Sequence, residues 1–149
     1  MATLKKRAIP TILFILAIIL ALSPFHLFPV CTHLMKNGKH MSCYYSAWFL
    51  IGMAVLMAIF SLIALFLSRH LWISVSYAAI LILTILGYVV PNRMIAIGHM
   101  KIQGWQIGLC MAPDMACRTT TLPAVTVILV LMGMLSIGGL ILNFLTEKK

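Results

Sequence analysis

The sequence predicts an all-α integral membrane protein of four transmembrane helices, and two observations lead to this fold class. Of the 149 residues, 63% are hydrophobic and only 9% are charged, whereas a soluble domain carries about 25% charged residues. The chain also contains four apolar runs, each close to the ~20 residues that cross a ~30 Å hydrocarbon core. Because backbone groups in lipid must be hydrogen-bonded within their own segment, we expect helices rather than open strands.

The four expected helices contain no Asp, Glu, Lys or Arg, and they cover about residues 10–27, 47–67, 71–90 and 122–145. Pro10 suits a first helical turn, where its missing N–H has no partner to lose. A short link that includes Arg69-His70 separates the second and third runs, which predicts a tight turn, and Pro91 ends the third. A cleaved signal peptide is the alternative for the first run, since Ala21-Leu22-Ser23 fits a cleavage site loosely; we expect an uncleaved helix.

The charge distribution excludes nucleic acid as a partner and predicts an orientation. There are 11 Lys and Arg residues against two acids, Asp114 and Glu147, which gives a formal charge of +9. The basic residues stand at the ends of the apolar runs, where they meet anionic headgroups of the lipid bilayer. We expect the protein to lie in the inner (plasma) membrane. The basic cluster before the first helix predicts that both termini are cytoplasmic. Both cysteine-containing loops then lie outside, where disulfides persist.

A repeated motif divides the single membrane domain (1–149) into two helical hairpins, about 8–68 and 71–145. His40-Met41-Ser42-Cys43 stands just before the second expected helix, and Asp114-Met115-Ala116-Cys117 stands just before the fourth. An earlier cysteine, Cys31 or Cys110, precedes each motif. Because both hairpins run in–out–in, the repeat is expected to be parallel, about an axis along the membrane normal.

The second outer loop is longer than the first and mixes apolar with polar residues between Asn92 and Leu109. We expect this part to lie along the membrane surface as an interfacial helix, with Trp105 at headgroup level. An ordinary packed loop is the alternative.

The four cysteines, if paired, admit three connectivities. Local pairing of Cys31 with Cys43 and of Cys110 with Cys117 closes loops of 12 and 7 steps, and each bond would stabilise its loop by roughly 2–3 kcal/mol. A bond between Cys43 and Cys117 would instead tie the two hairpins together. In either arrangement, the cysteines stiffen an outer cap.

Two functional interpretations of the same loops stay open. In the first, soft ligands hold Cu(I) or haem iron at the outer face, with candidate ligands beyond the cysteines at His40, Met41, His99 and Met115. In the second, the protein is a membrane thiol–disulfide oxidoreductase, because Cys43 and Cys117 precede helix N-termini whose dipoles favour a thiolate. The chain contains no Cys-x-x-Cys motif, which counts against the second interpretation.

A chain with two acids offers almost no carboxylates for acid–base catalysis, so an enzyme is not expected. Small residues on the helices instead indicate surfaces where helices approach closely: Ala54 and Ala58 in the second helix, and Gly133 and Gly138 in the fourth. These surfaces pack inside the monomer, or against a larger membrane subunit or a second copy of the chain.

The Cys and Met motifs carry a resemblance to a known family. The segment Cys110-Met111-Ala112-Pro113-Asp114-Met115-Ala116-Cys117, followed by Thr121-Leu122-Pro123, resembles a family of small prokaryotic membrane proteins catalogued only as a domain of unknown function. His40-Met41-Ser42-Cys43 is similar to the first motif of that family, but Tyr44 stands where His is expected, which weakens the metal or haem interpretation. The resemblance implies four helices, no catalytic residues and a place beside ABC transporters of the macrolide-exporter or FtsX-like permease type. We therefore expect a non-enzymatic accessory subunit of such a complex.

Overall fold

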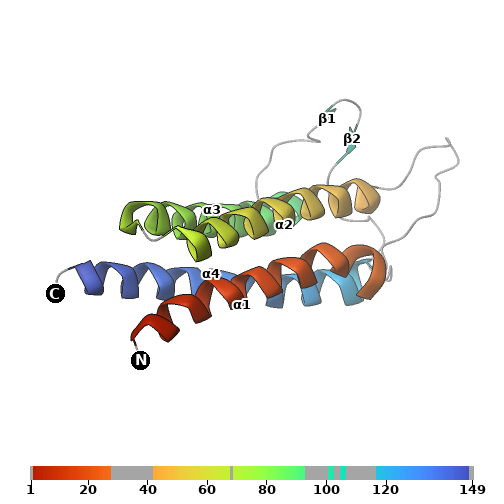
Figure 1. Ribbon diagram of the computed structural model, residues 1–149. Coiled ribbons are helices and arrows are strands. Elements are labelled where there is room, and N and C mark those ends of the chain that lie inside the picture. The colour runs from red at the N-terminus through yellow and green to blue at the C-terminus, as the bar shows by residue number, and fades with distance from the viewer. Residues whose placement is uncertain are drawn as a thin grey trace, which may run out of the picture.

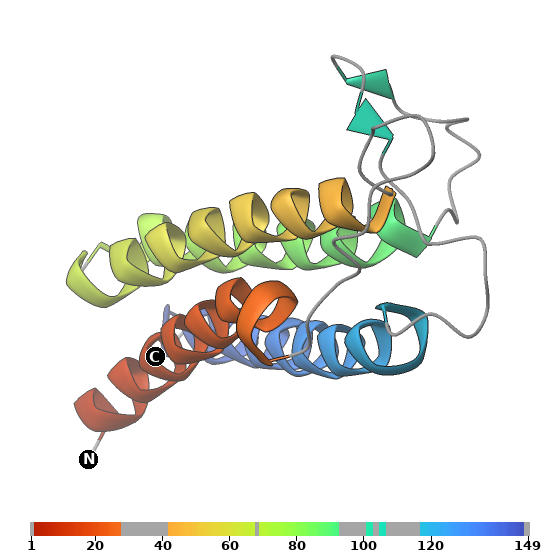
Figure 2. The same cartoon turned by 90° about the vertical axis from the view of Figure 1, so that its right-hand side faces the viewer.

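A computed structural model describes residues 2–27, 42–67, 69–92, 101–102, 105–106 and 117–147. These residues form four long α-helices and two five-residue π-helical segments: α1 (Ala2–Leu22), η1 (Ser23–Leu27), α2 (Ser42–Phe66), α3 (His70–Asn92), η2 (Cys117–Thr121) and α4 (Leu122–Glu147). Helices α2 and α3 form one layer, and α1 and α4 form the other (Figures 1 and 2). Helices that follow one another in sequence run antiparallel, so both termini and the α2–α3 link lie at one end.

Three of the helical segments are long and apolar enough to cross a membrane: Tyr44–Phe66, His70–Val90 and Thr119–Leu145. The apolar part of α1, Arg7–Leu22, is shorter, and η1 continues it directly. The expected all-helical fold with four long helices is therefore present, and three helices satisfy the length and composition of a span.

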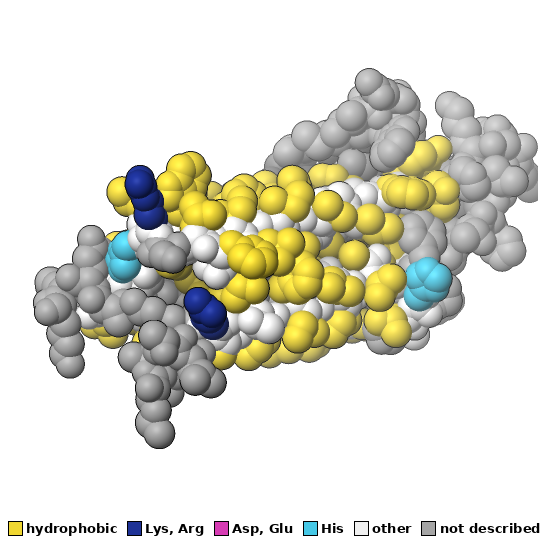
Figure 3. Space-filling view, viewed as in Figure 1, with side chains coloured by type: hydrophobic (Ala, Val, Ile, Leu, Met, Phe, Trp, Pro, Cys, Tyr) yellow, Lys and Arg dark blue, Asp and Glu magenta, His cyan; other side chains and the backbone are white. Residues whose placement is uncertain are grey.

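The side chains of the bundle are distributed with apolar groups outside and hydroxyls inside. Large apolar side chains are exposed on all four helices, and they cover most of the described helical surface in Figure 3. Among the described residues, eight polar side chains are buried: Ser23, Ser46, Ser61, Ser76, Thr84, Thr121, Ser136 and Asn143. Water would not favour such a surface, whereas hydrocarbon would. This distribution is typical of a multi-pass membrane protein.

One apolar cluster fills the centre of the bundle and draws on every helix. Its fully buried members include Leu13 and Leu20 of α1, Met57 of α2, Ile80 of α3 and Met132 of α4. Helix α1 packs mainly against α2, and α3 packs against both α4 and α2, while α1 and α4 touch less extensively. Each pair of helices that are consecutive in sequence is therefore also a pair in space.

Several helix ends differ from the sequence-based expectation. Helix α1 begins at Ala2 rather than near Pro10, so Pro10 lies inside the helix and not in its first turn. The reason is that the preceding Lys5-Lys6-Arg7 favours helix, which continues the helix on the N-terminal side of the proline. Helix α2 likewise begins at Ser42, and the link to α3 is Leu67–Arg69, with His70 already helical.

The Met-x-Cys cysteines therefore lie within the helical segments rather than before them. Cys43 is the second residue of α2, and Cys117 is the first residue of η2, which leads directly into α4. Both segments begin at the end of the bundle opposite the termini. Both cysteines thus lie at the start of a helical segment, with Cys43 in α2 itself and Cys117 five residues before the start of α4.

The described part of the segment between α3 and α4 forms a short antiparallel pair, β1 (Lys101–Ile102) and β2 (Trp105–Gln106), with Lys101 opposite Gln106. Strand β2 contacts α2. The interfacial helix expected in this loop does not include these four residues, because their backbone groups pair across a hairpin. The rest of that expectation lies outside the described residues.

Candidate functional site

A polar clamp joins α3 to α4 at the end of the bundle that carries the termini. We use this name for His70, Ser74 and Asn143. Nδ2 of Asn143 donates to the backbone oxygen of His70 at 3.2 Å and to Oγ of Ser74 at 2.9 Å. Nε2 of His70 lies 2.6 Å from the backbone oxygen of Asn143, and because a carbonyl can only accept, Nε2 is the donor. Asn143 is buried, so these bonds satisfy an amide that would otherwise be stranded in an apolar environment.

Two turns further along α3, an aromatic ring fits against a glycine of α4. A Cβ atom added at Gly139 would lie 2.7 Å from Cζ of Tyr77 and 2.8 Å from its Cε1, distances too short for carbon atoms that are not bonded. Tyr77 is only 3% exposed, so the ring has little room to retreat. The absence of a side chain at Gly139 is what lets the two helices approach here.

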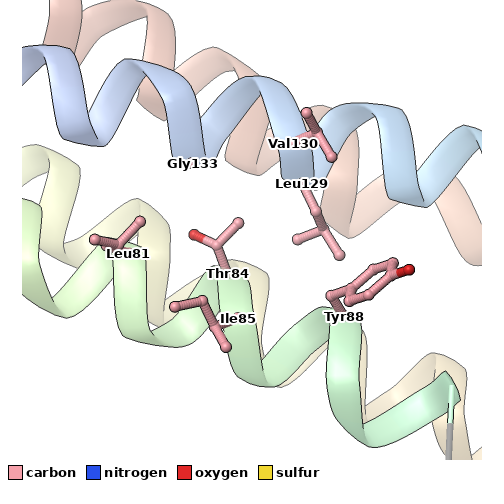
Figure 4. A pocket seen from close by; sticks show the side chains of 7 residues that line it. All are labelled: Leu81, Thr84, Ile85, Tyr88, Leu129, Val130 and Gly133. Carbon is pink, nitrogen blue, oxygen red and sulfur yellow. The ribbon is translucent and has the colours of Figure 1, made fainter. Parts of the chain in front are cut away.

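A groove of about 210 Å³ follows in the middle of the α3–α4 seam. We call it the seam groove, and Figure 4 shows its lining residues: Leu81, Thr84, Ile85 and Tyr88 from α3, with Leu129, Val130 and Gly133 from α4. A Cβ at Gly133 would lie 4.0 Å from Cγ2 of Thr84. The Thr84 hydroxyl donates to the backbone oxygen of Ile80. The hydroxyl is thus satisfied within α3, and the groove lining is apolar.

The seam groove opens to the surroundings of the bundle. Ile85 is 55% exposed and Val130 is 48% exposed, and they stand on the two sides of the opening. Thr84 and Leu129 are buried and form part of its floor. The groove can therefore receive an apolar group from beside the bundle.

A comparison with protein families identifies the relatives of this chain. The model of one family, described as Domain of unknown function (DUF4418), matches residues 13–142. The chain belongs to the DUF4418 family. No curated protein and no solved structure matches it. The matched region contains the seam groove, Tyr77 and Gly139, and all four cysteines.

The small residues singled out in the DUF4418 chain do not form one surface. Ala54 is buried in the central cluster, and Ala58 packs against it half-buried. Gly133 lines the seam groove. A Cβ at Gly138 would have no heavy atom within 4 Å, so this glycine faces open space. The structure thus places Ala54 and Ala58 inside the bundle and Gly133 at the seam groove.

The candidate disulfide and metal residues are almost all outside the described part of the DUF4418 chain: Cys31, Cys110, His40, Met41, His99 and Met115. For Cys43 and Cys117, the structure describes the backbone only. Among the residues whose side chains are described, no group of three His, Cys, Asp or Glu side chains lies together. The pairing of the cysteines and the copper or haem interpretation remain predictions.

The seam residues of α3 were not identified from the sequence. Thr84 follows Tyr77 by seven positions, and Tyr88 follows Thr84 by four. This spacing puts the three side chains on one face of the helix. That face lies against the glycines of α4. The feature that could have identified them is a pair of patterns: polar or aromatic residues at helical spacing on one helix, and glycines on the next. Inspection of each helix by itself does not reveal this pairing.

Proposed function

We propose that this DUF4418 protein is a non-enzymatic membrane subunit that docks on a larger transport complex of the ABC type. The seam groove is the observation that supports the proposal best. It is a preformed apolar recess, open to the side, in the middle of two helices that are each long enough to cross a membrane. The family resemblance contributes the kind of complex.

The proposal includes four membrane spans in the inner (plasma) membrane. Both termini then lie on the cytoplasmic side. The apolar part of α1 has sixteen residues, Arg7–Leu22, which span about 24 Å. The five residues of η1 extend it to the ~20 residues that a span needs. All four helices would then cross together, and the cysteine loops would lie outside as a disulfide-stabilised cap. The places of Cys43 and Cys117, each at the start of a helical segment, support a parallel repeat of two hairpins.

The occupant that fits the seam groove is an apolar side chain from a transmembrane helix of the transport partner. A cavity of about 150 Å³ holds a benzene ring, so about 210 Å³ accommodates a large apolar side chain. The groove lies between Leu81 and Tyr88, midway along α3. A partner that reaches it must therefore itself be embedded in the hydrocarbon, which excludes soluble proteins.

The test is co-purification from native membranes with a variant that fills the groove. Val130→Trp places an indole in the opening, whereas Val127→Trp adds the same bulk on α4 at a side chain that is 58% exposed and outside the groove lining. We expect transport subunits to co-purify with the native protein and with Val127→Trp, and their yield to fall at least tenfold with Val130→Trp.

Two results would overturn the proposal. One is the absence of any transport subunit from the native preparation. The other is equal recovery of the subunits with both tryptophan variants, each shown to be folded by an unchanged thermal midpoint in detergent. Loss of recovery with Val127→Trp alone would move the docking surface away from the seam groove.

A copper- or haem-binding outer face is the second candidate function. Its supporting observation is that Cys43 and Cys117 both begin helical segments at the same end of the bundle, so two Met-x-Cys arms from symmetric loops can contribute to one site. Mass spectrometry with and without reductant separates the alternatives. Two reductant-sensitive bonds contradict thiolate ligation of copper, whereas stoichiometric copper or a Soret band supports a site. Quinone-driven thiol exchange is required for the oxidoreductase alternative.

A further inference from the structure

The short turn between α2 and α3 carries unusually exposed apolar side chains around one cation. Phe66 and Leu71 are each 77% exposed, the highest values among the large hydrophobic side chains of the described residues. Trp72 is 52% exposed, and Arg69 is also exposed. We call Phe66, Arg69, Leu71 and Trp72 the turn patch. Neither water alone nor hydrocarbon alone suits this mixture, but the boundary between them does.

On each side of the turn, the backbone is hydrogen-bonded into the adjoining helix. The N–H of Leu67 donates to the oxygen of Ile63 at 2.9 Å, which continues the bonding of α2. The oxygen of Arg69 accepts from the N–H of Ile73 at 3.3 Å, which starts the bonding of α3. The next residue, His70, is held to Asn143 of α4 by the polar clamp. Arg69 therefore stands, with its side chain exposed, at the hydrogen-bonded start of α3.

The charge at this end of the bundle favours an anionic partner. The termini lie at the same end as the turn patch, and the described Lys and Arg side chains in Figure 3 gather there. Arg7 is exposed on α1. The sequence adds Lys5, Lys6, Lys148 and Lys149 near the termini, against the single acid Glu147. A negatively charged surface with an apolar interior is complementary to both features of the turn patch.

We propose that the turn patch binds the headgroup of an anionic phospholipid. Arg69 contacts the phosphate, Trp72 lies at headgroup level, and Phe66 and Leu71 enter the acyl chains. An acidic soluble protein would satisfy Arg69 but would leave two apolar side chains without a matching environment. The lipid satisfies all four side chains at once, and the site does not depend on the docking of a transport partner.

Tryptophan quenching by brominated lipids tests the proposal on the full-length protein. In a chain with Trp48→Phe and Trp105→Phe, Trp72 is the single tryptophan. Vesicles are prepared with brominated phosphatidylglycerol or with brominated phosphatidylcholine. Because one basic residue near the surface favours an anionic lipid by about fivefold, we expect Trp72 to associate about fivefold more strongly with brominated phosphatidylglycerol. With Arg69→Gln, this ratio should fall by up to about fivefold, and any preference that is left comes from the other basic residues at this end.

Arg118→Gln is the matched control, because it removes the same charge from the backbone segment η2 at the opposite end. It should leave the lipid preference at Trp72 unchanged, and circular dichroism should show the same helix content in all variants. Equal quenching by the two lipids in the unsubstituted background would overturn the proposal. So would a preference that Arg69→Gln leaves unchanged, or that Arg118→Gln reduces equally.

Discussion

The two helical hairpins share one topology but are held together by different chemistry. In the α1–α2 hairpin, the buried Ser23 and Ser61 hydroxyls have no hydrogen-bond partner among the described residues. In the α3–α4 hairpin, the buried Asn143 bonds to two residues of the facing helix, and Tyr77 fits against a glycine. The first pair therefore depends more on apolar packing, while directional contacts specify the second.

This difference matters because the surroundings of the bundle are themselves apolar. When lipid replaces water, burying a Leu side chain between helices brings little hydrophobic gain over leaving it in the acyl chains. Close packing and interhelical hydrogen bonds then decide which helix faces meet. The α3–α4 hairpin has both kinds of contact, so we expect it to hold its geometry, and that of the seam groove, more firmly than α1–α2 holds its own.

Obstruction of the closest approach between helices in the second hairpin should change the stability of the protein most. Gly139→Ala would place a methyl group against the buried ring of Tyr77, and overpacking of this kind costs about 1–3 kcal/mol. Gly138→Ala is the control, since its added methyl meets no atom within 4 Å. Unfolding of the detergent-solubilised protein by dodecyl sulfate measures both.

We expect the free energy of unfolding to fall for Gly139→Ala and to stay level or rise slightly for Gly138→Ala, because alanine favours helix more than glycine does. Equal effects of the two substitutions would show that Tyr77 yields easily and that the seam is not closely packed at this point.

Removal of the clamp amide should have the next largest effect. Asn143→Leu deletes the donor to the His70 carbonyl and to Ser74, while the His70 ring still reaches the backbone oxygen of residue 143. Interhelical hydrogen bonds in membranes contribute about 0.6 kcal/mol on average, so two lost bonds predict a destabilisation of about 1 kcal/mol, measured by the same unfolding assay. Ser74→Ala removes only one partner and should cost about half as much. A larger loss with Ser74→Ala than with Asn143→Leu would contradict this arrangement of the clamp.

The existence of the four helices could be predicted from the sequence because each is an apolar run without charge, and lipid allows such a run few other structures. The ends could not be predicted as well. Helix α1 extends eight residues before Pro10, since polar helix formers continue a helix beyond the apolar segment that marks it. The motif placed Cys43 and Cys117 just before their helices, whereas each lies at the start of a helical segment. The repeat of the two hairpins stays a prediction.

The seam groove could not be predicted because it arises from the register between two helices. Gly133 was recognised as a position of close approach, but its neighbour Thr84 is 49 positions earlier in the chain. The hydrogen bonds of Asn143 could not be predicted either, because nothing in the sequence assigns its partners, His70 and Ser74. Side-chain periodicity gives the face of a helix, whereas the axial offset of two helices is set by packing.

Removal of the Ser61 hydroxyl in the first hairpin should change the free energy of unfolding least. Ser61 is fully buried in α2, and its Oγ has no hydrogen-bond partner among the described residues. A buried hydroxyl without a partner is unfavourable, so Ser61→Ala should raise the free energy of unfolding by up to about 1 kcal/mol. Ser136→Ala on α4 is the matched control, because the Ser136 hydroxyl donates to the backbone oxygen of Met132 at 2.8 Å.

That bond lies within one helix and also forms when the helices separate in detergent, so its loss should change stability little. A rise for Ser61→Ala without a rise for Ser136→Ala would show that the first hairpin tolerates a polar group which its packing does not use. A clear fall for Ser61→Ala would mean that the hydroxyl acquires a partner in the membrane, and the two hairpins would then be more alike in chemistry than their packing indicates.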